Sequence, residues 1–172
     1  MLSILYRLTL AVNRFTRLLS CAVAWLVLAA VIISAGNAIS RKTLNVASNA
    51  WLEAQWYLFG AVFLLGAAYA LRTDAHVRID IVSSRLNPRA RTAIDVLLHC
   101  VFLVPFCLVM IGQSWPWFER SYAIGEMSSN AGGLVIWPAK LMIPIGFAVL
   151  LLQTVSEIIS KGLDLAGWEP PS

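Results

Sequence analysis

Charged side chains are scarce in this sequence. They make up 13% of its 172 residues, whereas hydrophobic residues make up 59%. A soluble globular domain carries roughly 25% charged residues, so we expect lipid, not water, to surround most of this chain. The net charge is only +4, and lysines and arginines form no long run. The sequence therefore predicts no nucleic-acid partner.

Cysteine is also scarce, and its spacing argues against thiol chemistry. The three cysteines are Cys21, Cys100 and Cys107, and no two of them form a CxxC motif. Cys100 and Cys107 would lie two turns apart on one helix, about 10 Å, which is too far for a disulfide. We interpret all three as small buried hydrophobic residues.

A catalytic or transport site is not recognisable either. The sequence shows no nucleophile–base set, no series of carboxylates at membrane depth and no inverted repeat. His76 and His99 have no carboxylate or cysteine at the spacing of metal ligands. We therefore predict no catalytic residues, no metal site, no haem or other cofactor, and no transport site within this chain.

Long apolar stretches are what the sequence has in abundance. Four of them, over residues 18–36, 51–71, 93–115 and 134–159, are long enough to cross a bilayer at ~1.5 Å per residue. The predicted fold class is an all-α integral membrane protein, with a four-helix membrane domain over 18–160. Asn87 and Pro88 fit an N-cap and first helical position, and Pro105 and Pro144 should bend their helices.

The two ends of the chain are predicted to lie outside the membrane domain. Over residues 1–17, apolar residues such as Ile4, Leu8 and Phe15 recur at helical spacing, and arginines lie mostly on the other face. This pattern is typical of an amphipathic helix that lies along the cytoplasmic leaflet before the chain turns into the membrane. Residues 161–172 are predicted to form a short cytoplasmic tail.

The distribution of basic residues predicts the orientation. Nine of the thirteen lysines and arginines fall in the two terminal segments and the loop between spans two and three. The positive-inside rule places those segments in the cytoplasm. The opposite, outer interface then gathers an aromatic belt: Trp51, Trp56, Trp115, Trp117 and Trp137. The predicted location is the bacterial inner membrane, with both termini cytoplasmic.

Glu53 is the most conspicuous polar residue, because it lies just inside the start of the second span. At that depth it can be hydrated, or pair with Arg41 or Lys42 of the preceding loop. We favour a structural ion pair or polar contact over direct binding of a proton or cation. Gln55 and Tyr57 beside it suit a hydrogen-bonded cluster at the interface.

An ordered set of motifs resembles the small permease subunit of tripartite ATP-independent periplasmic (TRAP) transporters, the DctQ-type family. The set covers about residues 20–155. It comprises Asn37-Ala38-x-Ser40-Arg41, Trp51-x-Glu53-x-Gln55-Trp56-Tyr57-Leu58-Phe59, Ala68-Tyr69-x-Leu71-Arg72-x-x-x-His76-Val77-Arg78-Ile79-Asp80, Glu126-x-Ser128 and Gly133-Leu134-x-x-Trp137-Pro138-x-Lys140.

The resemblance implies a division of labour. A periplasmic binding protein captures an organic acid, a large permease subunit carries the substrate and sodium sites, and the small subunit widens the static scaffold and helps to dock the binding protein. Two alternatives stay open: a four-helix membrane anchor of a haem- or quinone-linked redox enzyme, and a small proton-coupled exporter that uses Glu53.

The residues expected to contact the partner subunit or phospholipids fall into two groups. The outer group comprises Arg41, Trp51, Glu53, Gln55 and Trp56, with Glu126, Trp137 and Lys140 of the second outer loop. The inner group comprises Arg72, His76, Arg78 and Asp80, where lipid phosphates would bridge some of the arginines.

Overall fold

A computed structural model describes residues 2–45, 48–75 and 87–168. Its helices are α1 (Leu2–Thr43), α2 (Asn49–Arg72), α4 (Pro88–Leu98), α5 (Val104–Ala123) and α6 (Trp137–Leu165), with a π-helical turn, η1 (His99–Leu103), between α4 and α5. The α4–η1–α5 segment is continuous from Pro88 to Ala123 and, with α1, α2 and α6, gives four helices long and apolar enough to cross a membrane. The predicted all-α membrane fold is confirmed.

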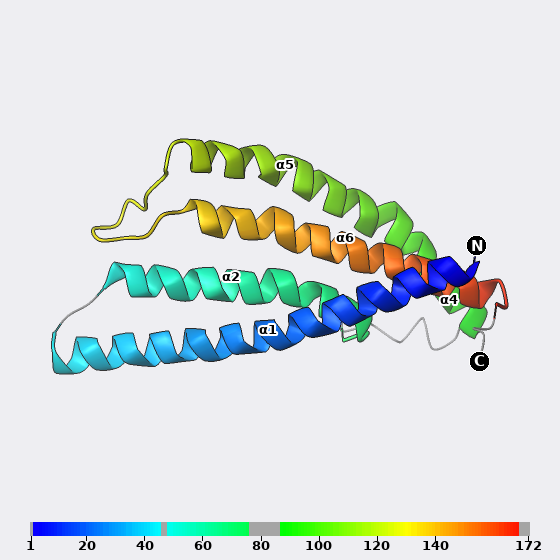
Figure 1. Ribbon diagram of the computed structural model, residues 1–172, viewed down its shortest axis with the longest axis horizontal. Coiled ribbons are helices and arrows are strands. Elements are labelled where there is room, and N and C mark those ends of the chain that lie inside the picture. The colour runs from blue at the N-terminus through cyan, green and yellow to red at the C-terminus, as the bar shows by residue number, and fades with distance from the viewer. Residues whose placement is uncertain (1, 46–47, 76–86, 169–172) are drawn as a thin grey trace.

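Helix α6 is the central element of the bundle. It packs against α1, α2, α4 and α5, whereas α2 packs against α1 and α6. Figure 1 shows α5, α6, α2 and α1 side by side in that order, with the first part of α1 crossing over α6. The start of α1 and the end of α6 lie at one end of the bundle, and the α1–α2 and α5–α6 connections lie at the other (Figure 1).

Most residues buried between the helices are small or polar. In α1 they recur every seven residues: Thr9, Thr16, Val23, Ala30 and Asn37. Cys107, Ser114 and Ser121 repeat this spacing in α5, as do Ala61 and Ala68 in α2. A seven-residue repeat keeps one stripe of each helix on its neighbour, and small residues allow close approach in lipid, where large apolar side chains gain nothing by turning inward.

Large apolar residues accordingly face outward. Trp25 is 71% exposed, Phe63 79% and Phe102 67%. Among the cysteines, Cys107 is buried as predicted, but Cys21 and Cys100 are exposed, so their predicted burial is wrong. Both lie on faces of apolar helices that neighbouring helices leave uncovered.

The separate helix predicted for residues 1–17 is also wrong as an element, because α1 runs unbroken from Leu2 to Thr43. Arginines at positions 14 and 17 do not end a helix, and the sequence around them has no proline or glycine that would. At 1.5 Å per residue this helix is about 63 Å long. Its first turns pack on α6 through Thr9 and Thr16 and leave Ile4, Leu8 and Phe15 exposed.

The structure confirms the predicted start of the third span and shows how the backbone accommodates Pro105. The Asn87 side chain accepts a hydrogen bond from the Ala90 N–H at 2.7 Å, with Pro88 at the first helical position. Pro105 has no N–H to continue an α-helical ladder. The chain adopts the wider η1 turn immediately before it, where the Val104 N–H bonds to the His99 carbonyl.

Candidate functional site

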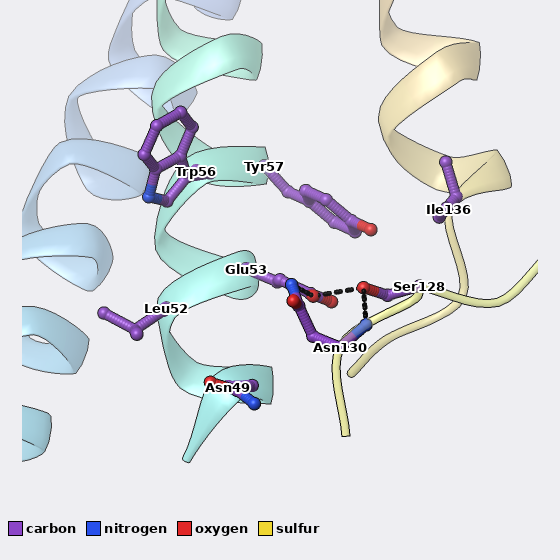
Figure 2. Close-up of a pocket in the computed structure, with 8 residues that line it drawn as sticks. All are labelled: Asn49, Leu52, Glu53, Trp56, Tyr57, Ser128, Asn130 and Ile136. Carbon is purple, nitrogen blue, oxygen red and sulfur yellow. Dashed lines mark hydrogen bonds between the residues drawn. The ribbon is translucent and has the colours of Figure 1, made fainter. Parts of the chain in front are cut away.

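The first turns of α2 are fastened to the α5–α6 loop by the carboxylate of Glu53. Its Oε1 accepts hydrogen bonds from the Ser128 hydroxyl and from Asn130 Nδ2, the latter at 2.8 Å, and its Oε2 accepts one from the Leu134 N–H at 2.6 Å. Figure 2 shows Glu53 extending from α2 to meet Ser128 and Asn130 on the loop. We call Glu53, Ser128, Asn130 and Leu134 the outer clasp, after the predicted orientation of this end of the bundle.

The loop has this shape because of its glycines. Gly125, with φ of 59°, ends α5: its N–H bonds to the Tyr122 carbonyl and the Glu126 N–H to the Ser121 carbonyl, the two bonds of a Schellman cap. The chain then doubles back on itself, with the Ser128 N–H bonded to the Leu134 carbonyl at 2.9 Å.

Gly133 is required for a different reason, which is space. A Cβ at this position would lie 2.5 Å from Ser128 Cβ and 2.8 Å from Glu53 Oε1. The loop backbone therefore approaches the carboxylate so closely that only glycine fits.

A second contact at the same end joins Glu126 to Lys140. Lys140 lies in the first turn of α6, is 7% exposed, and bonds to Glu126 Oε2 while its Nζ sits 4.3 Å from the centre of the Trp117 ring. The hydrogen bond from Lys140 lowers the pKa of Glu126 below its ordinary value. Trp137, also in the first turn of α6, packs edge-on to Tyr122 with ring centres 5.4 Å apart.

Beside the outer clasp lies a pocket of about 510 Å³. Its lining residues come from the first turns of α2 and from the α5–α6 loop: Asn49, Leu52, Glu53, Trp56, Tyr57, Ser128, Asn130 and Ile136 (Figure 2). The lining is mostly apolar, with one carboxylate and a few polar groups, which is the usual composition of a ligand or partner site.

A polar network lies nearer the other end of the bundle, between α1 and α6. The side chain of Gln153, which is fully buried, accepts a hydrogen bond from the Thr16 hydroxyl at 2.8 Å and donates to Asn13 Oδ1 at 2.9 Å and to Glu157 Oε1 at 3.0 Å. This network fixes the first turns of α1 on α6.

Comparison with known proteins identifies the family. A profile of the DctQ component of tripartite ATP-independent periplasmic transporters matches residues 30–162. The chain belongs to this family. DctQ components are parts of transporters and not enzymes. Membership of this family therefore excludes the alternative of a membrane anchor for a redox enzyme. The four apolar helices and the family together support a multi-pass protein of the bacterial inner membrane.

A curated DctQ relative also matches. The C4-dicarboxylate TRAP transporter small permease protein DctQ of Pseudomonas aeruginosa (strain PAO1) is 24% identical over 127 residues. The match covers 69% of this chain and 59% of that protein, so the chain spans about three fifths of the length of the curated relative it matches.

In this DctQ-family chain, Glu53 makes a structural polar contact, but its partners in the described residues are not Arg41 or Lys42. Arg41 lies in the last turn of α1 and is exposed, and Glu53 is held instead by the loop that follows α5. Trp51 packs near Gly36, where an added Cβ would lie 2.9 Å from its ring. Glu126 and Lys140 pair with each other, and Trp137 packs on Tyr122 at the same end of the bundle.

The remaining predicted residues are more scattered. Trp56 is 75% exposed and lines the pocket, whereas Gln55 is half-buried and lies outside that lining. Arg72 lies in the last turn of α2, at the opposite end. His76, Arg78 and Asp80 lie outside the described residues.

The motifs Glu126-x-Ser128 and Gly133-Leu134 mark the α5–α6 loop in the sequence, but they do not by themselves link this loop to Glu53. Serine, asparagine and glycine between two spans were the available signal. Trp117 and Gln153 were missed as contact residues. Gln153 had a signal, because an amide inside an apolar stretch must find hydrogen-bond partners.

Proposed function

We propose that this chain is the small scaffold subunit of a sodium-driven secondary transporter that takes up organic acids. It would work with a separate large permease subunit and a periplasmic substrate-binding protein. Membership of the DctQ family supports the role as a transporter subunit. The name of the Pseudomonas relative, a C4-dicarboxylate transporter component, supports an organic acid as cargo.

The observation that carries a bracing role is the outer clasp. Three donors hold the Glu53 carboxylate, and Lys140 holds Glu126. A carboxylate that couples transport to an ion must exchange its ligands in each cycle, whereas these carboxylates tie α2, α5 and α6 to one another. Such ties suit a subunit that stays still beside a moving one, and they argue against the exporter alternative.

The proposed orientation puts the outer clasp at the periplasmic face and the start of α1 and the end of α6 in the cytoplasm. The arginine distribution supports this orientation through the positive-inside rule. The clasp and its pocket then face the side from which a binding protein arrives. Arg72 and the neighbouring basic residues would contact phospholipid phosphates at the inner face.

Reconstitution into vesicles tests the proposal. We expect sodium-driven uptake of an organic acid when this chain, the large permease and the binding protein are all present. Omitting this chain should abolish uptake, and vesicles that contain this chain alone should show none. Uptake by this chain alone, or undiminished uptake without it, would overturn the scaffold assignment.

A further inference from the structure

An apolar groove continues from the outer pocket along the bundle. It has a volume of about 550 Å³ and shares Trp56 and Tyr57 with the pocket described above. Its other lining residues come from α2, α5 and α6: Gly60, Ala61, Phe63, Leu64, Met110, Ala139, Met142, Ile143 and Phe147. The two cavities therefore meet at one end of α2. The pocket is partly polar, and the groove is apolar.

The groove is open toward the surroundings of the bundle. Its walls come from α2 and α5, which both pack against α6. Gly60 has open space where a Cβ would stand, and Phe63 beside it is 79% exposed. Because these helices cross the membrane, whatever fills the groove over this length has to be apolar.

The pocket at the mouth of the groove carries negative charge. A carboxylate offers about four acceptor positions. Oε1 of Glu53 receives two donors and Oε2 receives one, so Oε2 keeps a position open. Within residues 2–45, 48–75 and 87–168, no lysine or arginine forms an ion pair with Glu53. The side-chain oxygen of Asn130 and the hydroxyl of Tyr57 add acceptors on the same lining.

We infer that the pocket and groove together bind one phospholipid with a primary-amine headgroup. The ammonium group would donate to Glu53 Oε2 and its neighbours, and an acyl chain would lie in the apolar groove. Charge complementarity selects this lipid: phosphatidylcholine has a cation without N–H donors, and phosphatidylglycerol has no cation. Lipid binding depends on neither the cargo nor the coupling ion, so failure of the transport test would leave this inference standing.

Native mass spectrometry tests the site on the full chain, purified in complex with its partner subunit. Phosphatidylethanolamine, phosphatidylcholine and phosphatidylglycerol with identical acyl chains are added in turn. We expect one phosphatidylethanolamine to be retained about tenfold more strongly than either other lipid, the effect of one charge-assisted hydrogen bond. Equal retention of the three lipids would overturn the assignment.

Two pairs of variants separate the headgroup from the acyl chain. Gly60→Leu places its Cβ in open space, extends into the groove and should abolish lipid retention. Gly112→Leu, at another glycine where a Cβ meets open space, should not. Glu53→Gln should remove the preference for the amine. Ser128→Ala loosens the outer clasp but keeps the carboxylate, so it should keep that preference.

A partner helix is the competing occupant of the groove. If Phe63→Cys crosslinks to a helix of the partner subunit and the complex retains no lipid, the groove belongs to that helix and the lipid assignment fails. Retention by Gly60→Leu equal to the unaltered chain would also refute it.

Discussion

Replacing Gly133 with alanine is expected to open the outer clasp. The added methyl would lie 2.5 Å from Ser128 Cβ, 2.7 Å from its hydroxyl oxygen and 2.8 Å from Glu53 Oε1. Because real contacts of this kind are longer, the loop and the carboxylate must separate. Overpacking of this kind costs about 1–3 kcal/mol, and the separation also weakens the hydrogen bonds that Glu53 accepts.

Since water can replace the lost hydrogen bonds of this carboxylate, overpacking sets the size of the effect, and we expect a loss in the upper part of its range, about 2–3 kcal/mol, in loop stability. Hydrogen exchange at the Leu134 amide, which donates to Glu53, measures this loss directly. A change of that size accelerates exchange by about 30- to 150-fold. Global unfolding should shift less, because α2 and α6 remain packed along their lengths.

The matched control is Gly112→Ala, because a Cβ there meets nothing within 4 Å. Alanine is the better helix former by roughly 0.5–1 kcal/mol, so this variant should leave Leu134 exchange unchanged and raise the melting temperature slightly. If the Leu134 amide stays equally protected in Gly133→Ala, the close approach of loop and carboxylate does not exist in the protein, and the reasoning fails.

Three further predictions concern the polar network, pH and orientation. Gln153→Leu should loosen the contact between the first turns of α1 and α6, because each hydrogen bond lost within the membrane costs about 0.6–1.7 kcal/mol. Backbone hydrogen exchange around Thr16 should become faster, and unchanged exchange there would contradict the network. Pairing with Lys140 lowers the pKa of Glu126 in the folded protein. The pair therefore stabilises the fold fully at any pH above the ordinary glutamate pKa of about 4.3. This contribution is lost as pH falls further, through the lower pKa of the folded state. Trp117 fluorescence should report that loss, and Glu126→Gln should remove the pH dependence. Orientation can be tested with single cysteines in a background without the native ones. In whole cells with a permeabilised outer membrane, Ser129→Cys should react with an impermeant thiol reagent, whereas Ser3→Cys should react only after lysis. The reverse pattern would invert the proposed orientation.

The number and approximate places of the membrane helices could be predicted because lipid imposes a simple requirement. A chain that crosses it needs about 20 apolar residues in a row, and those runs are visible without any knowledge of packing. The start of α4 was equally predictable, since Asn87 and Pro88 act on the backbone beside them. Each of these features depends on neighbours in sequence.

The contacts of Glu53 could not be predicted in the same way. Its partners lie 75 to 81 residues further along the chain, and their approach depends on a loop shaped by glycines. Arg41 seemed the better partner because it is close in sequence and opposite in charge. The identity of the buried faces was hidden for a related reason: in lipid the large apolar residues turn outward, so Thr9 and Thr16, not Phe15, mark where α1 meets α6.

The central place of α6 has a consequence for how the protein is made. This helix follows α1, α2, α4 and α5 along the chain, yet α5 finds its main packing surface on it, as do the first turns of α1. The hairpin of α1 and α2 can pair early in synthesis, but α5 must wait in the bilayer with its stripe of Cys107, Ser114 and Ser121 uncovered. A nascent chain stalled before Trp137 would therefore present that stripe to the insertion machinery and to quality-control proteases.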